Sequence, residues 1–213
     1  MSRYLLIRRV MLGVLCLWCL GPSSGWAGEG HDRLTQFLSG LETLQARFEQ
    51  QILNREDNTS GYASGSFELF RPGRFRWDYD GEEGQTIIAD GRDVWIIDAE
   101  LVQITQHRQS WALKGTAARL LAEEIDIAAE FELRELGDRR GHVWLQLLPR
   151  DEDSQFESLL LGFAGNDLSV LEMRDSFDQL TRFRFFDIQR NLSLDPDRFT
   201  FDPPDSWDVF GSY

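Results

Sequence analysis

The chain has 213 residues and a formal net charge of −14, with 36 acidic and 22 basic side chains. This acidity excludes sequence-independent binding to nucleic acid, which needs cations against the phosphates, and it opposes electrostatic attachment to anionic lipid. The length suits one domain of ordinary size.

The first 27 residues have the pattern of a cleaved secretory signal. Three arginines precede an uncharged apolar run at residues 10–20, and Gly25-Trp26-Ala27 supplies small residues for a signal peptidase. The apolar run is too short to span a bilayer as a helix. Cleavage lowers the formal charge from −14 to −17, because three arginines and no acid leave with this segment. We therefore predict a periplasmic protein of residues 28–213 that forms a single domain.

An amphipathic helix is predicted over residues 32–45. Apolar side chains recur there at helical spacing: Leu34, Phe37, Leu38, Leu41 and Leu44. The apolar side of this helix is bulky, so the helix must lie on a hydrophobic surface. Residues 46–52 then alternate between apolar and polar, which predicts the first strand.

The stretch 61–105 alternates with a period of two and supplies about four strands. Pro72-Gly73 and Asp90-Gly91 are turn signals between the runs. The large side chains of this stretch are taken to share one buried face: Phe75, Trp77, Tyr79 and Trp95.

A second helical stripe covers residues 109–124, and alternating strands then resume up to residue 189. Pro203-Pro204 is expected to forbid further regular pairing. The count of about eleven short strands, without a βαβ rhythm, favours a strongly curved antiparallel sheet or an open barrel over a parallel sheet. The two helices would lie across its concave face as a lid and enclose a hydrophobic cavity.

No catalytic constellation is recognisable in the sequence. The three histidines, His31, His107 and His142, lack the spacing of metal ligands. There is no nucleophile elbow, phosphate-binding loop or dinucleotide fingerprint. We therefore predict a binding protein rather than an enzyme, with no metal and no cofactor.

Arg71, at the entry to the Pro72-Gly73 turn, has two interpretations. It is either an exposed turn arginine, or its guanidinium donates to backbone carbonyls at the end of a helix lying over the sheet. In the second case it would latch a movable lid. The aromatic strands likewise either fill a core or line a cavity. The cavity interpretation depends on the aromatic sheet, the two apolar helices and the missing catalytic group taken together.

Several segments resemble the LolA family of periplasmic lipoprotein carriers, and the resemblance runs along nearly the whole predicted mature chain. The segments are ARFEQ (46–50), RPGRFRWDY (71–79), ADG (89–91), VWIID (94–98), GTAARLLA (115–122) and RFTFDPP (198–204). The combination of RP-x-x-F-x-W, a DG turn and an aromatic-aliphatic strand is specific, although each piece alone is weak.

The resemblance implies an unclosed barrel with a helical lid, whose cavity takes the acyl chains of a lipoprotein. It implies a monomer that receives cargo from an inner-membrane ABC transporter and delivers it to an outer-membrane acceptor lipoprotein, without a cofactor. By position, Arg71 matches the family's lid-holding arginine. The candidate cavity residues, from the resemblance and the apolar pattern together, are Phe37, Leu41, Phe48, Phe75, Trp77, Trp95, Leu120 and Leu121.

One departure from the family pattern concerns the lid. Ala117, Ala118 and Arg119 stand where well-known members carry larger apolar residues, so this lid should close less tightly. Relatives of this fold serve other lipids, and a lipid-binding module of another transport or sensing pathway is therefore the alternative function.

Overall fold

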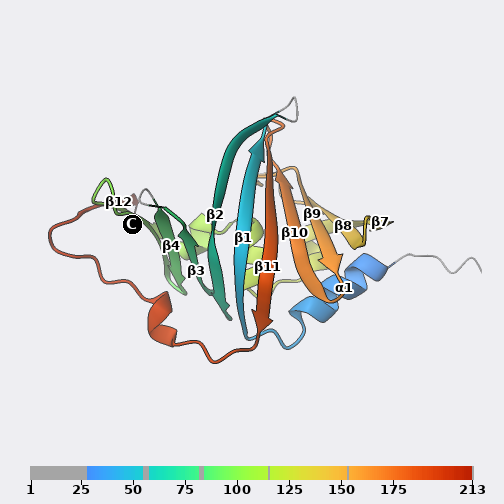
Figure 1. Cartoon of the computed structure of the whole chain (residues 1–213), viewed down its shortest axis with the longest axis horizontal. Helices are drawn as coiled ribbons and strands as arrows, with labels where there is room; N and C mark the ends of the chain where they lie inside the picture. Colours follow the sequence, from blue (N-terminus) through green and yellow to red (C-terminus); the bar gives the residue numbers. More distant parts are fainter. Residues whose placement is uncertain (1–27, 55–57, 82–83, 115, 153, 213) are drawn as a thin grey trace, which may run out of the picture.

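Twelve β-strands form one curved sheet in this structure, a computed structural model (Figure 1). The structure describes residues 28–212 apart from 55–57, 82–83, 115 and 153. The strand order is β12-β6-β5-β4-β3-β2-β1-β11-β10-β9-β8-β7. Among the described residues the edge strands β12 and β7 do not pair with each other, so the sheet curls without closing. This confirms the predicted unclosed β-barrel.

All the strands except β12 lie in or overlap the segments that the sequence predicts as strands. They are β1 (Thr43–Leu53), β2 (Thr59–Phe70), β3 (Arg74–Tyr79), β4 (Gln85–Asp90), β5 (Asp93–Asp98), β6 (Gln103–Arg108), β7 (Phe131–Arg139), β8 (His142–Pro149), β9 (Ser158–Ala164), β10 (Asp167–Arg174), β11 (Leu180–Arg190) and β12 (Asp208–Ser212). Neighbouring strands are antiparallel, except that β12 runs parallel to β6.

The helices are short and lie around the curled sheet. They are α1 (Glu29–Leu38), α2 (Gln109–Ala112), α3 (Ala117–Ala122), α4 (Ile127–Glu130) and the 3-10 helix η1 (Pro196–Phe199). α1 contacts β7, β8 and β10, whereas α3 contacts β2. Figure 1 shows α1 beside the β8–β10 side of the sheet and the yellow-green helices behind its central strands. In the described part of the chain, no helix has both the length and the apolar character needed to cross a membrane.

Two hydrophobic clusters lie on opposite faces of the sheet. The larger one fills the inner face and joins α1 and α3 to strands β1, β2 and β8–β11. The smaller one consists of Ile88, Trp95 and Ile104, against which Phe201 and Trp207 of the C-terminal segment pack. The C-terminal segment therefore covers the outer face of the sheet before it ends as β12.

The predicted first helix was too long at its C-terminal end. α1 ends at Leu38, Ser39 is extended, and Gly40 has a φ of 64° that an L side chain rarely adopts. Leu41 and Leu44 are buried in the core, but Leu41 lies in the connection to β1 and Leu44 lies on β1. Leu41 and Leu44 follow Phe37 at helical spacing although the helix has ended. The spacing arises because all three side chains are buried in the same core.

Two further predictions are corrected. The second helix is divided into α2 and α3, since Thr116 between them has an extended backbone. The chain also pairs again after Pro203-Pro204, because β12 begins at Asp208 and runs along the free edge of β6. The prolines prevent pairing only at their own positions.

Candidate functional site

An apolar cavity of about 350 Å³ lies between the inner face of the sheet and the helices α2 and α3. Its sheet wall is largely aromatic: Phe67, Phe75, Trp77, Tyr79, Phe183 and Phe185. The helices contribute Trp111, Ala112, Leu113, Ala117, Ala118 and Leu121. The volume is at the lower end of the range for ligand pockets, about 300–1,000 Å³.

Strand register explains why these side chains share one wall. Phe67 pairs with Trp77, Trp77 with Ile87, and Ile87 with Ile96. Directly paired residues on neighbouring strands point to the same face of a sheet. These four residues therefore form a row across β2, β3, β4 and β5 that faces the helices.

Trp77 is the centre of the aromatic wall. Its ring centroid lies 4.6 Å from that of Phe67, 4.8 Å from Phe48 and 5.1 Å from Phe183. Its indole nitrogen is buried and has no hydrogen-bond partner among the described residues. Three aromatic rings packed around Trp77 hold it in place, so the wall has a defined shape before any ligand binds.

Tyr79 ends the aromatic wall with a polar group. Its hydroxyl donates a hydrogen bond to Gln50 Oε1 at 2.8 Å. Burial raises the pKa of the Tyr79 phenol above its ordinary value. The phenol therefore stays neutral at physiological pH, and the wall carries no charge at this end.

Three of the eight candidate cavity residues line this cavity, namely Phe75, Trp77 and Leu121. Phe48 is fully buried and contacts Trp77 without reaching the cavity surface. Phe37 borders a separate void of about 10 Å³ together with Leu121. That void is barely large enough for one water molecule.

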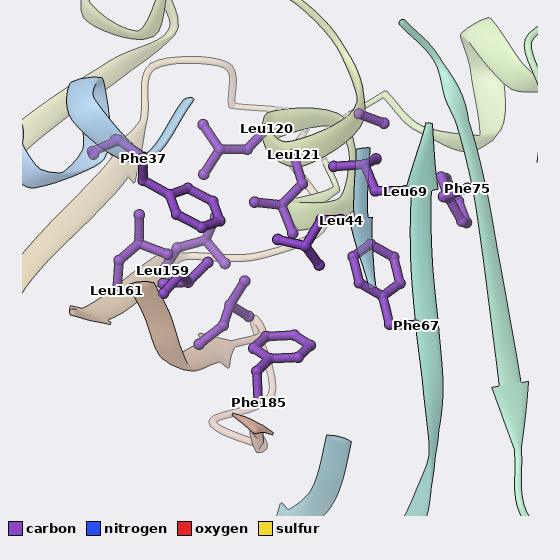
Figure 2. Close-up of a cluster of buried hydrophobic side chains, with 14 of the residues drawn as sticks. Phe37, Leu44, Phe67, Leu69, Phe75, Leu120, Leu121, Leu159, Leu161 and Phe185 are labelled. Atoms are coloured by element: carbon purple, nitrogen blue, oxygen red, sulfur yellow. The ribbon is translucent and has the colours of Figure 1, made fainter. Parts of the chain in front are cut away.

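The other side of Leu121 belongs to a packed core. Figure 2 shows Leu121 above Leu44, between Phe37 of α1 and Phe67 of β2. Leu41 and Leu120 are buried in this core and do not line the cavity. The barrel interior is therefore filled next to α1 and hollow beneath α2 and α3.

Trp95 was placed on the wrong face by the sequence analysis. It pairs with Ile88 and contacts Phe201 on the outer face, where its indole nitrogen donates to Asp90 Oδ2 at 2.9 Å. Its neighbours Val94 and Ile96 line the cavity instead. Successive side chains on a strand alternate between faces, so β5 cannot present all its large residues to the cavity.

Three aromatic residues line the cavity although they were not predicted to do so, namely Phe67, Phe183 and Phe185. Phe183 and Phe185 are two positions apart on β11, and Phe67 has the same parity as Leu69 on β2. The period-two signal was present for all three. What the sequence did not contain was the pairing of β11 with β1, which leaves only β1 between β11 and β2 and so places β11 on the same curved wall as β2 and β3.

Arg71 joins the C-terminal ends of two helices. Its Nη1 donates to the carbonyl of Leu38, the last residue of α1, at 3.3 Å. Its Nη2 donates to the carbonyl of Glu123, just after α3, at 2.6 Å. The backbone N–H of Gly73 donates to the Ala122 carbonyl at 2.8 Å. The contact with helix-end carbonyls that the sequence suggested for Arg71 is therefore present.

The guanidinium of Arg71 is held at an energetic cost. Burial lowers its pKa, and the nearby Glu124 carboxylate partly offsets that effect. Its Nε is buried without a hydrogen-bond partner among the described residues. An arginine nevertheless stays charged in proteins, so it donates charge-assisted hydrogen bonds, which are stronger than neutral ones.

α1 is fixed at both ends by charged side chains of the sheet. At its N-terminus, the Glu135 carboxylate accepts hydrogen bonds from the backbone N–H groups of Gly30 at 2.8 Å and His31 at 3.0 Å. At its C-terminus, Arg190 Nη2 donates to the Phe37 carbonyl at 2.6 Å. These charges complement the helix dipole. α1 therefore closes one end of the barrel independently of Arg71.

α3 has fewer anchors than α1. Its cavity face consists of Ala117, Ala118 and Leu121. Arg119 points away from the cavity and forms ion pairs with Glu123 at 3.0 Å and Glu130 at 2.8 Å, which tie α3 to α4. About a third of each of these side chains is exposed, and such pairs contribute little. The contacts of α3 with the sheet are thus mainly Leu120, Leu121 and the Arg71 turn.

Comparison with known proteins agrees with this architecture. The family model described as "Outer membrane lipoprotein carrier protein LolA" matches residues 39–202. A protein of Methylococcus capsulatus called an outer-membrane lipoprotein carrier protein is 38% identical over 197 residues, which is 92% of this chain and 95% of that protein. One of the same description from Nitrosomonas europaea is 40% identical over 177 residues, covering 83% of this chain and 86% of its own.

A solved structure of much lower sequence identity has a similar fold. An uncharacterised conserved protein from Thermus thermophilus superposes with a TM-score of 0.54 at 15% identity, covering 87% of this chain and 99% of that one. The likeness at this identity concerns the fold alone. With the family model spanning most of the sequence and relatives well above 30% identity, the chain belongs to the LolA family of outer-membrane lipoprotein carrier proteins.

Proposed function

We propose that this chain is a periplasmic lipoprotein carrier that holds the acyl chains of its cargo in the cavity beneath α2 and α3. The observation that carries the proposal is the apolar cavity of about 350 Å³, whose wall is built from aromatic rings and whose lid ends at Arg71. Burial of acyl chains stabilises a complex by about 0.8 kcal/mol for each methylene. An apolar container therefore lets a lipid anchor cross an aqueous compartment.

The closed cavity is too small for a complete lipid anchor. At about 30 Å³ for each water-sized group, 350 Å³ accommodates about a dozen chain carbons. Stable membrane anchoring takes more than one acyl chain. Cargo binding therefore requires α3 to move outward, and breaking the bond from Arg71 to the Glu123 carbonyl is the step that permits this movement.

The partners and the compartment follow from family membership. The carrier would receive cargo from an inner-membrane ABC transporter and deliver it to an outer-membrane acceptor lipoprotein. The predicted signal, residues 1–27, lies outside the described residues. The carrier acts by binding and release, without catalysis and without a cofactor, as a monomer.

Mass spectrometry of material co-purified from the periplasm tests the proposal directly. We expect acylated N-terminal peptides of outer-membrane lipoproteins in the wild-type preparation. A variant with a filled cavity should carry much less of them. Depletion of the protein in cells should leave lipoproteins at the inner membrane. Normal lipoprotein localisation after depletion, or a co-purified lipid without peptide, would instead favour the lipid-binding module of another pathway.

A further inference from the structure

The row of paired residues on the cavity wall continues to the edge of the sheet. Ile96 of this row pairs with Thr105 of β6, and Thr105 pairs with Phe210 of β12. Phe210 therefore points to the same face as the cavity wall, because paired residues share a face. The side chain of Phe210 is 52% exposed.

Trp111 of α2 borders the cavity at the same margin. It lines the cavity and yet is 63% exposed. Its ring lies 5.2 Å from that of His107, which also lines the cavity and pairs with Val94 of β5. The inner face of β6, which carries Thr105 and His107, thus connects the cavity to the exposed rings of Trp111 and Phe210.

The adjacent residue of β12 points the other way. Val209 pairs with Ile104, which is fully buried in the outer-face cluster with Trp95. Val209 is 45% exposed, close to the value for Phe210. Two neighbouring apolar residues of similar exposure thus lie on opposite faces of one edge strand, and only Phe210 continues the cavity wall.

We propose that the surface formed by Thr105, His107, Trp111 and Phe210 is an exit shelf on which the distal methylenes of the cargo's acyl chains lie. The inference rests on the proposed carrier function and names where the part of the cargo that exceeds the cavity is bound. With the lid closed the cavity has room for about a dozen carbons, and outward movement of α3 enlarges it; chain length beyond the enlarged cavity meets the margin where Trp111 lines the cavity and is exposed. The chain ends are less exposed to water when they lie along Thr105 and Phe210, where the row of paired residues reaches the edge of the described sheet.

Single-cysteine labelling tests the exit shelf. Cys16 and Cys19 are the only cysteines in the sequence, and both lie in the predicted signal. Mature protein with Phe210→Cys therefore carries one thiol for a polarity-sensitive fluorophore, and Val209→Cys is the matched control. The ligands are two monoacylated lipopeptides, one with a chain of about ten carbons, which fits the cavity, and one with a clearly longer chain. Binding is measured separately, by displacement of a hydrophobic dye from the cavity.

We expect both lipopeptides to displace the dye, but only the long-chain one to shift the emission of the label at position 210. The label at position 209 should not respond. In unlabelled protein, Phe210→Ser should weaken binding of the long-chain lipopeptide about tenfold and leave the short-chain one unchanged. Val209→Ser should change neither affinity, and the thermal midpoint of both variants shows whether β12 remains paired.

Dye displacement without any response at position 210 overturns the exit shelf and leaves the carrier function standing. Equal responses at positions 209 and 210 also overturn it, because they indicate that β12 moves as a whole or binds a partner strand. If neither lipopeptide displaces the dye, the proposed carrier function itself is refuted.

Discussion

Replacing Arg71 by leucine is expected to free the lid more than it weakens the fold. The substitution removes the charge-assisted bond from Nη2 to the Glu123 carbonyl, which is 2.6 Å long, and the longer bond from Nη1 to the Leu38 carbonyl. Hydrogen bonds to charged groups contribute about 1.5–3 kcal/mol. Only the first of the two bonds holds α3.

The lower end of that range applies to Arg71. Its Nε is buried without a partner among the described residues, and such a group costs about 1–3 kcal/mol. Leucine removes this cost together with the bonds, so the loss in unfolding free energy should be only about 1 kcal/mol. Losing about 1.4 kcal/mol from the closed lid would raise the open population about tenfold.

Arg190→Leu is the matched control for this experiment. Arg190 also donates to a C-terminal carbonyl of α1, at 2.6 Å, and also has a buried Nε without a partner in the described structure. It has no bond to α3 among those described. We therefore expect the two variants to lose similar stability, whereas only Arg71→Leu changes lid opening.

The assay measures release of a bound lipopeptide to detergent micelles or to acceptor, together with the urea midpoint. Since apparent affinity rises with the fraction of the binding-competent open state, Arg71→Leu should bind lipopeptide up to about tenfold more tightly and release it more slowly. Equal changes of release in the Arg71 and Arg190 variants would refute the latch. So would a loss of stability in Arg71→Leu as large as its effect on release, because Arg71 would then be a structural residue.

Three further predictions concern the cavity, the outer face and pH. Ala118→Leu adds three carbons to a cavity with room for about a dozen and should weaken lipopeptide binding about tenfold without lowering the thermal midpoint, and unchanged binding would argue against this cavity as the site. Arg198→Met leaves the buried Glu68 carboxylate without its ion-pair partner at 2.7 Å, although Gln45 Nε2 still donates to it, and should cost about 1–3 kcal/mol in urea unfolding, most of which the additional change Glu68→Gln should restore. Burial raises the pKa of Asp90, but hydrogen bonds from the Asp93, Arg92 and Trp95 N–H groups lower it more, so the pKa is below its ordinary value. The ionised Asp90 carboxylate therefore stabilises the fold above about pH 4, and this stabilisation is lost as the pH falls further. Asp90→Asn should therefore reduce unfolding free energy at neutral pH and flatten its dependence on acid, and a parallel dependence in both proteins would contradict this account.

The general architecture was predictable because local pattern and tertiary burial agree along most strands. Alternation from Phe67 to Tyr79 marked both the strands β2 and β3 and the face they present to the cavity. For Arg71 the sequence left two interpretations open, an exposed turn arginine or a donor to helix-end carbonyls. The structure has the second arrangement, with contacts to the Leu38 and Glu123 carbonyls.

The remaining features depend on which strands become neighbours. Phe183 and Phe185 reach the cavity only because β11 pairs with β1, more than a hundred residues away in the chain. Trp95 was assigned to the wrong face because residue size, rather than alternation, was used to group it with Trp77. β12 was missed because a short parallel strand after two prolines has no local signal that distinguishes it from a loop.

The small residues of the lid determine cavity volume and lid strength together. Ala117 and Ala118 line the cavity, so every methylene added at these positions takes space from the ligand and adds contact with the aromatic wall. A lid with larger side chains would close more tightly over a smaller cavity. With alanines, closure depends on Leu121 and on the bonds from the Arg71 turn to the Ala122 and Glu123 carbonyls. In the proposed cycle, cargo enters when the lid opens and leaves as the lid closes again, and a lid held by a few polar contacts at one end makes this change at low cost while the aromatic wall keeps its shape.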